Sequence, residues 1–266
     1  DVTPTVPNSY TPMPGSGESK TITITEGTNE INFYYYKNVE LKANSKTETY
    51  NGQEQSVSGF TGAPEDADFS AITVGAKGTN VGKYPAEFAD GTVDTVDATG
   101  KYIVTKAING TLKITPVETE VVVKIAGNTK TETYNGKEHS VEGYTVASIS
   151  NTLYTANDFT FSGTAEAKGT NAGTYPMGLT ADQFANTNGN FTNVTFNVTD
   201  GWLKINPAET EVTVTITGHT GSHTYDGNEK TVTGYDVSID NELYTANDFT
   251  FTGTAEAKGT NAGTYP

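Results

Sequence analysis

Residues 153–176 read LYTANDFTFSGTAEAKGTNAGTYP, and residues 243–266 repeat this stretch with Thr252 in place of Ser162 as the only difference. A more diverged copy, GAKGTNVGKYP, ends at Pro85. The tripeptides Tyr-Asn-Gly at 50–52 and 134–136 and Tyr-Asp-Gly at 225–227 recur 84 and then 91 residues apart. A period near 90 residues is too long for a solenoid repeat and fits a complete small β-sandwich.

The composition predicts that these repeats are all-β. Threonine accounts for 48 of the 266 residues and tyrosine for 15, and both favour pleated, half-solvated strands. Residues 120–127 (EVVVKIAG), 211–218 (EVTVTITG), 158–165 and 191–199 alternate between apolar and polar side chains, as strands with one buried face do. We therefore expect tandem immunoglobulin-like or β-grasp-like sandwich modules of about 90 residues, arranged end to end.

Turn and stop signals divide each repeat further. Asn-Gly and Asp-Gly tolerate positive φ at both central positions of a tight turn, so the tripeptides predict type I′ hairpins with positive φ at their glycines. Thr180 to Gln183 has the T-x-x-Q spacing of a capping box and predicts one helical turn. Residues 202–205 (WLKI) predict a closing strand with Leu203 and Ile205 inward, and Pro116 and Pro207 predict the strand ends.

The predicted domain order follows from these signals. Residues 1–17 hold four of the ten prolines and predict a stiff linker, and residues 18–38 look like the tail of a preceding module. Repeat 1 is placed at 39–117, repeat 2 at 118–208 and repeat 3 at 209–266. Repeat 3 lacks counterparts of the last strands of repeat 2, so we expect it to be incomplete, with an open edge suited to head-to-tail self-association.

The charge balance argues against two classes of partner. The chain carries a net charge of −16, with 32 acidic residues and 16 lysines but no arginine. Nucleic-acid binding depends on cations that displace counterions from phosphates, so no nucleic-acid partner is expected. No apolar run is long enough for a membrane span, so no membrane insertion is expected in this segment, and the absence of cysteine excludes disulfides.

Several short motifs resemble a known family. The YNG/YDG turn, the AGTY segment and the closing strand NG-x-L-x-I-x-P resemble the mostly-β, glycine-rich (MBG/YDG-type) repeats of Gram-positive bacterial surface adhesins. Residues 26–38 (EGTNEINFYYYKN) resemble the end of a mucin-binding-protein-type repeat. The resemblance covers about residues 18–266. It implies an extracellular, cell-surface location, with anchorage to the cell wall in the full-length protein.

Two sets of residues are candidates for ligand contact. Asp66, Asp68, Asp158 and Asp248 offer the hard carboxylate oxygens that calcium prefers, although no EF-hand loop accompanies them and solubilising acids are the favoured interpretation. Exposed aromatic faces make good contacts with carbohydrate or protein, and Tyr34, Tyr35, Tyr36, Tyr154 and Tyr244 are the candidates, with a core role as the alternative for each. We expect no cofactor.

The favoured function is a non-catalytic repeat region of a bacterial surface protein that serves as an adhesive stalk or spacer. The alternative is a dedicated glycan- or mucin-binding module, whose partners would be glycans or proteins of host or microbial surfaces. A third, less favoured function is an appendage of a surface enzyme. Repeated acids in small sandwiches without a deep cleft argue against catalysis within this chain.

Overall fold

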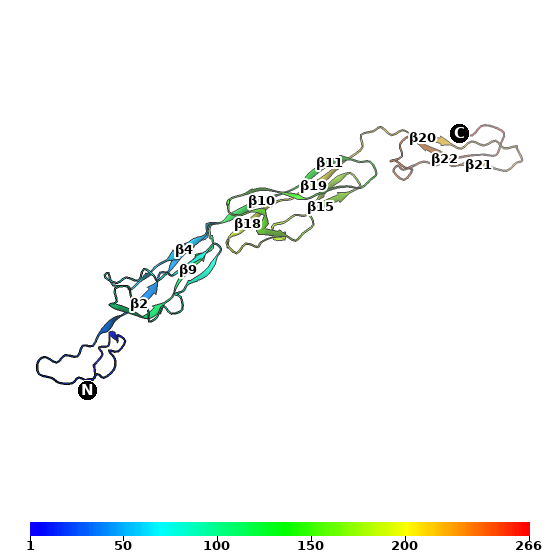
Figure 1. Cartoon of the computed structure of the whole chain (residues 1–266). Coiled ribbons are helices and arrows are strands. Elements are labelled where there is room, and N and C mark those ends of the chain that lie inside the picture. Colours follow the sequence, from blue (N-terminus) through cyan, green and yellow to red (C-terminus); the bar gives the residue numbers. More distant parts are fainter. The chain divides into compact units, whose positions relative to one another are not determined.

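The computed structural model describes residues 1–266 and is all-β, with 23 short strands and two single 3₁₀ turns, η1 (Ala156–Asp158) and η2 (Ala181–Gln183) (Figure 1). The chain forms two compact units. Unit 1 holds Asp1–Lys124, Val146–Ser162 and Phe184–Asn197, and unit 2 holds the intervening and C-terminal residues. No helix has the length and hydrophobicity needed to cross a bilayer.

Unit 1 contains a four-stranded sheet centred on β2 (Tyr35–Ala43). Strands β1 (Tyr10–Pro12) and β5 (Phe60–Thr61) pair with β2 antiparallel, and β8 (Tyr102–Ile108) pairs with it in parallel. Alternate residues of β2 point inward, and a buried core forms from Val39, Leu41, Phe69, Tyr102 and Val104. The stretch predicted as a linker, residues 1–17, thus includes one sheet strand.

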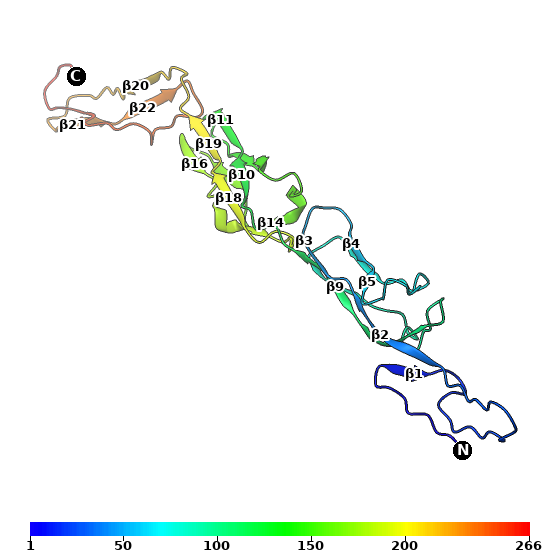
Figure 2. The same cartoon turned by 90° about the vertical axis from the view of Figure 1, so that its left-hand side faces the viewer.

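A second sheet of unit 1 has the order β3 (Lys46–Thr49), β9 (Gly110–Thr115) and β7 (Gly82–Ala86), visible near the β3 and β9 labels in Figure 2. Beside it, β4 (Gln55–Ser58) pairs antiparallel with β6 (Gly75–Gly78). Leu112 and Ile114 of β9 are almost fully buried because every second residue of the strand faces this core. The unit also contains the pair β14 (Phe159–Phe161) and β17 (Phe184–Asn186).

Unit 2 repeats the second sheet of unit 1. Its order is β11 (Thr129–Thr133), β19 (Trp202–Asn206) and β16 (Gly173–Pro176), with β11 parallel and β16 antiparallel to β19. The pairing register is also the same, because Lys130 lies opposite Leu203 just as Lys46 lies opposite Leu112. The strands β12 (His139–Glu142) and β15 (Glu166–Gly169) form the accompanying antiparallel pair.

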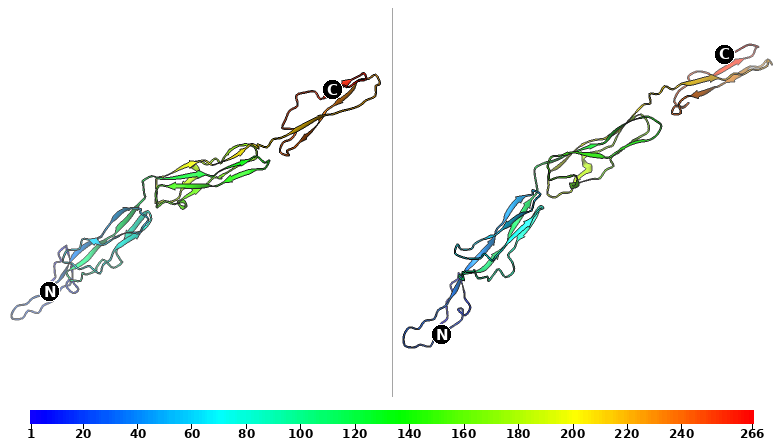
Figure 3. Two further views of the ribbon diagram at one scale, coloured as in Figure 1. Left: turned by 90° about the horizontal axis from the view of Figure 1, so that it is seen from above. Right: turned by 45° about the horizontal axis from the view of Figure 1, so that its top comes forward.

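The C-terminal part of unit 2 consists of two antiparallel pairs, drawn in the orange part of Figure 3. Strand β20 (Val214–Gly218) pairs with β22 (Tyr235–Ile239), and β21 (Lys230–Thr233) pairs with β23 (Glu256–Gly259). In repeat 2 the corresponding strand β10 (Val121–Gly127) lies between β13 (Tyr144–Ile149) and β18 (Val194–Thr199). Strand β20 therefore has one unpaired edge where β10 has none.

The alternating sequences form strands at 120–127 and 202–205, whereas 158–165 contains only β14 (Phe159–Phe161) and 191–199 only β18 (Val194–Thr199). Residues 120–127 contain β10, and residues 202–205 lie in β19, where Leu203 and Ile205 are buried and Lys204 is exposed. Strands β9 and β19 end immediately before Pro116 and Pro207. The predicted helical turn is η2, where the Thr180 N–H donates to Gln183 Oε1 at 3.0 Å.

The prediction of type I′ hairpins at the tripeptides is half wrong. The φ of Gly52, Gly136 and Gly227 is positive (77°, 74° and 77°), as predicted. Asn51, however, has no positive φ, and its side-chain Oδ1 accepts a hydrogen bond from the Gln53 N–H at 2.9 Å. The loop is therefore an Asx turn, and it connects strands of different sheets rather than the two arms of a hairpin.

Substitutions at Gly136 and Gly227 can separate the energetic cost of positive φ in this turn from the cost of a steric clash. A Cβ on Gly136 would lie 2.7 Å from Leu243 Cδ2, whereas a Cβ on Gly227 would meet no atom within 4 Å. Replacing Gly227 by Ala should cost about 1 kcal/mol of local unfolding free energy through positive φ alone. Gly136→Ala should cost more and should shift the methyl resonances of Leu243. Native-state hydrogen exchange with methyl NMR measures both, and equal effects of the two variants would contradict this contact.

Candidate functional site: the junctions between repeats

The aspartates suggested as calcium ligands in repeat 1 accept hydrogen bonds from protein groups. Asp66 accepts from the Tyr102 hydroxyl at 2.6 Å and the Lys101 ammonium at 3.1 Å, and these bonds lower the pKa of the Asp66 carboxyl. Asp68 Oδ1 accepts from the Ser70 N–H at 3.0 Å, which lowers the pKa of that carboxyl. Asp66 thus joins its loop to the start of β8, and Asp68 holds a local turn.

Asp158 and Asp248 cap the same turn in two repeats. The Asp158 Oδ2 accepts from the backbone N–H of Thr155 at 2.7 Å and from its hydroxyl at 2.8 Å, which completes the capping box of η1. Asp248 makes the same two bonds to Thr245, and they lower the pKa of the Asp248 carboxyl. No cluster of three or more potential metal-ligating His, Cys, Asp or Glu side chains is present.

Sequence reasoning missed Asp97, which is 4% exposed. The Oδ1 atom of Asp97 accepts from the backbone N–H groups of Lys101 and Tyr102 at 2.9 and 2.8 Å. The Oδ2 atom accepts from the backbone N–H groups of Asp68 and Thr99 and from the Thr99 hydroxyl. Burial acts to raise the pKa of Asp97, but these donors outweigh it and hold the pKa far below its ordinary value. One carboxylate thus fixes the loop before β8.

Because the pKa of the Asp97 carboxyl is lower in the folded protein than in the unfolded chain, the stability of repeat 1 depends on the charge of this carboxyl. Above the unfolded-state pKa of about 4 the contribution of Asp97 should be fully present, and it should be lost as the pH falls through about 4 toward the folded pKa. Asp97→Asn, which cannot accept all these bonds, should cost repeat 1 about 2 kcal/mol at neutral pH and flatten its acid dependence below pH 4. Hydrogen exchange of β8 amides from pH 2.5 to 7 measures this. Asp90→Asn is the exposed control, and an unchanged acid profile in Asp97→Asn would contradict the assignment.

The candidate tyrosines lie in different environments. Tyr34 is 59% exposed, while Tyr35 and Tyr36 lie in β2, opposite Pro12 and Thr11 of β1. Tyr154 is 2% exposed, and its hydroxyl lies 2.9 Å from the Asp158 carbonyl oxygen and 3.0 Å from Asn186 Oδ1. Burial, and then the charge of Asp158, raise the pKa of Tyr154 to about 12. Its ring is therefore a packing surface within unit 1.

Phe191 joins repeats 1 and 2 and is the centre of what we call the first junction. Its ring is 1% exposed and packs edge to face against two tyrosines. The centroid of Tyr50, in repeat 1, lies 5.7 Å away at an interplanar angle of 78°, and that of Tyr154, in repeat 2, lies 5.2 Å away at 87°. Edge-to-face packing at these distances is favourable beyond the area buried.

Hydrogen bonds on either side of Phe191 fix the junction. Asn190 Oδ1 accepts from the Val81 N–H at 2.8 Å, and Asn190 Nδ2 donates to Asn80 Oδ1 at 3.2 Å. The side chain of Asn190 therefore binds the loop of repeat 1 that contains residues 80 and 81. The backbone of Val117, the last residue assigned to repeat 1, donates to the Asn190 carbonyl at 2.9 Å and accepts from the Thr192 N–H at 3.2 Å. The end of repeat 1 is thus held by the same segment that carries Phe191.

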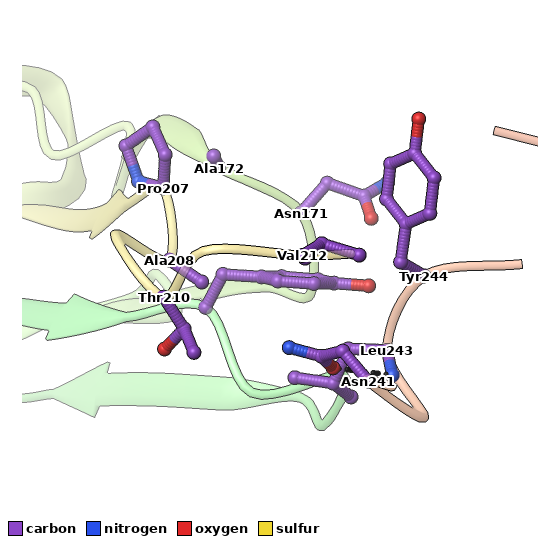
Figure 4. A pocket seen from close by; sticks show the side chains of 10 residues that line it. Asn171, Ala172, Pro207, Ala208, Thr210, Val212, Asn241, Leu243 and Tyr244 are labelled. Atoms are coloured by element: carbon purple, nitrogen blue, oxygen red, sulfur yellow. Dashed lines mark hydrogen bonds between the residues drawn. The ribbon is translucent and has the colours of Figure 1, made fainter. Parts of the chain in front are cut away.

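Unit 2 contains the corresponding region between repeats 2 and 3, which we call the second junction. It encloses a cavity of about 310 Å³, shown in Figure 4. Ten residues line it, and each aligns with a residue one repeat earlier: Tyr134, Asn171, Ala172, Pro207, Ala208, Thr210, Val212, Asn241, Leu243 and Tyr244. Among them Tyr134 aligns with Tyr50, and Tyr244 with Tyr154.

A spacing in the sequence marks the loop before Phe191. Asn186 Oδ1 accepts from the Asn188 N–H at 3.0 Å, and Asn186 Nδ2 donates to the Phe191 carbonyl at 2.9 Å. Asp97 also bonds to the residues two and five positions later, but it accepts from the N–H group of each. Residues 97–102 (DATGKY) and 186–191 (NTNGNF) therefore share the pattern Asp/Asn-x-x-Gly-x-Tyr/Phe, which could have identified Phe191 from sequence.

Truncating Phe191 should loosen the first junction. Phe191→Ala removes a fully buried ring, so the unfolding free energy of the β10–β18 region should fall by about 3 kcal/mol. Phe251→Ala, whose wild-type ring is 45% exposed, is the control and should change stability by less than about 1 kcal/mol. Site-resolved hydrogen exchange in urea measures both. A loss below 1 kcal/mol for Phe191→Ala would show that the aromatic contacts carry little energy.

Part of the chain is similar to a known family. Residues 121–207 match the model of the MBG domain, a stretch that runs from the start of β10 to the proline after β19. The match supports the MBG-type repeat indicated by the sequence motifs. No curated protein and no solved structure matches the chain.

Proposed function

We propose that this chain is the non-catalytic repeat region of a bacterial cell-surface protein and serves as an adhesive stalk or spacer. The observation that carries the proposal is the packing of Phe191 between tyrosines of consecutive repeats. A spacer must limit hinge motion between its modules, and a buried ring flanked by hydrogen bonds does so. The near-identical copies of residues 153–176 and 243–266 support selection for reach or valency.

The MBG match and the surface-adhesin motifs support an extracellular location on a bacterial surface, with cell-wall anchorage of the full-length protein. The capping roles of Asp158 and Asp248 support a non-catalytic repeat, because acids engaged by local backbone donors are poor candidates for proton transfer. The acidic, arginine-free composition supports partners other than nucleic acid.

Small-angle scattering tests the spacer. A compact globule of this length would have a radius of gyration of about 18 Å, and a spacer should exceed this clearly. Tyr50→Ala should broaden the distribution of interatomic distances because it frees the first junction. Tyr225→Ala removes the aligned tyrosine of repeat 3, which is 64% exposed, and should leave the distribution unchanged. The compact value for the wild-type chain would reject the spacer.

The alternative, a dedicated glycan- or mucin-binding module, is favoured by one observation, the tyrosine-lined cavity at the second junction. A glycan array distinguishes the two functions. The spacer should give no specific signal, whereas the alternative requires binding that Tyr244→Ala abolishes and Tyr225→Ala does not.

A further inference from the structure

Two turns that contain an Asn-Gly pair lie against the repeat that follows them. A Cβ on Gly52 would be 2.9 Å from Leu153 Cδ2, and a Cβ on Gly136 would be 2.7 Å from Leu243 Cδ2. Leu153 and Leu243 open the LYTAND stretches of repeats 2 and 3, and Leu243 is drawn in Figure 4. A chemical change in either turn therefore acts on a contact between consecutive repeats.

An Asn-Gly pair can modify itself without an enzyme. The backbone nitrogen of the glycine bonds to Cγ of the asparagine, the Cγ–Nδ2 bond breaks, and ammonia leaves with the proton of the glycine N–H. Water then opens the resulting succinimide at either of its carbonyl groups, which gives aspartate or isoaspartate. Glycine favours this attack because it has no Cβ to crowd the nitrogen and its backbone adopts the widest range of conformations.

Asn51 and Asn135 are exposed, and their amide oxygens already accept hydrogen bonds. Asn51 Oδ1 accepts from the Gln53 N–H at 2.9 Å, and Asn135 Oδ1 accepts from the Lys137 N–H at 3.0 Å. During the attack, negative charge develops on this oxygen, and a donor already in place stabilises it. Both turns are therefore set up for the reaction.

A second contact distinguishes Asn135 from Asn51. His139 Nε2 lies 3.0 Å from Asn135 Oδ1. The aligned residue in repeat 1 is Gln55, whose amide donates instead to the Thr49 carbonyl at 3.0 Å. When Nε2 carries a proton, the imidazole is a second donor to the oxygen on which charge develops, so Asn135 is the more reactive of the two.

The other two Asn-Gly pairs of the chain are held in place. Gly110 is buried in β9, and Asn109 Oδ1 accepts from the Phe88 N–H at 3.1 Å. Asn188 is half-buried, and its Nδ2, the nitrogen that would leave, donates to Asp158 Oδ1 at 2.8 Å. At both sites the reaction requires a local opening of the structure first.

Asp226 shows how the aspartate product fits the turn. Its Oδ1 accepts from the Asn228 N–H at 3.0 Å, as the asparagines do in repeats 1 and 2, and its Oδ2 accepts from the Lys230 ammonium at 2.6 Å. Isoaspartate differs, because its main chain passes through the side chain and gains a methylene. The glycine of an isoaspartate turn cannot keep its position against the leucine of the next repeat.

We propose that the Asn-Gly turns of repeats 1 and 2 are self-modifying sites. Asn51 and Asn135 convert to aspartate and isoaspartate in the folded chain, with water as the only co-reactant, and Asn135 converts faster. The aspartate form preserves the turn, whereas the isoaspartate form displaces the glycine and loosens the junction. The proposal holds whether the chain acts as a spacer or as a glycan-binding module.

Peptide mapping by mass spectrometry tests the sites. The full chain is incubated at mildly alkaline pH, both folded and in guanidinium chloride, where the four Asn-Gly pairs should convert at similar rates. Folding should slow Asn109 and Asn188 at least about tenfold, because they react only after opening, and should not slow Asn51 and Asn135. Comparable protection of all four sites, or equal rates at all four in the folded chain, would overturn the proposal.

His139→Gln gives repeat 2 the residue that repeat 1 has at this position. It should slow the conversion of Asn135 about fivefold, which corresponds to the loss of one hydrogen bond in the transition state. Asn51 in the same chain is the internal control and should convert at its wild-type rate. An unchanged rate at Asn135 would refute the order of reactivity.

Methyl NMR of Leu243 reports the effect on the junction. Asn135→Asp should leave these resonances close to their wild-type positions. A chain aged at alkaline pH should show a second set of Leu243 resonances in proportion to the isoaspartate found at residue 135. A single unchanged set in a chain rich in isoaspartate would overturn the proposed loosening.

Discussion

The edge-to-face packing of Phe191 between Tyr50 and Tyr154 is the contact on which the arrangement of repeats 1 and 2 within unit 1 depends. Phe191 and Tyr154 of repeat 2 form a cluster with Tyr50 of the preceding repeat, so the cluster is complete only when both repeats are present. Unit 1 accordingly contains all of repeat 1 together with the part of repeat 2 that carries Tyr154 and Phe191. The stability of such an array is a sum of repeat and interface terms, and here the interface term is aromatic.

The loops before Tyr102 and Phe191 are held by similar hydrogen bonds from two different side chains. Asp97 holds its loop as a buried carboxylate that accepts from N–H groups two and five residues later. Asn186 holds the equivalent loop by accepting from the N–H two residues later and donating to the carbonyl oxygen five residues later. The amide supplies a donor and an acceptor, so the second loop needs no buried charge. Repeat 1 is therefore the one whose loop becomes sensitive to acid.

Much of the fold could be predicted from local pattern, and the junction could not. Alternation at 120–127 and at Leu203 and Ile205 identified strands and their buried faces, because a strand has period two wherever it packs. The Asn-Gly turns were assigned to hairpins because the sequence does not show that the Asn51 side chain competes for a backbone donor. Phe191 was expected in an inner strand of its own repeat, since periodicity shows that a side chain is buried but not which repeat buries it.

Tyr154 and Tyr244 show how far local sequence determines environment in this chain. They lie in stretches of 24 residues that differ at one position, and each hydroxyl donates to the carbonyl four residues later, at 2.9 and 2.8 Å. Their local conformation is thus the same. Their burial is not, because Tyr154 is 2% exposed and Tyr244 is half-buried. Since the neighbouring residues are identical, the difference must come from the distant segment that carries Phe191. Burial of Tyr154 at the first junction is therefore a tertiary property, supplied by the distant segment that carries Phe191.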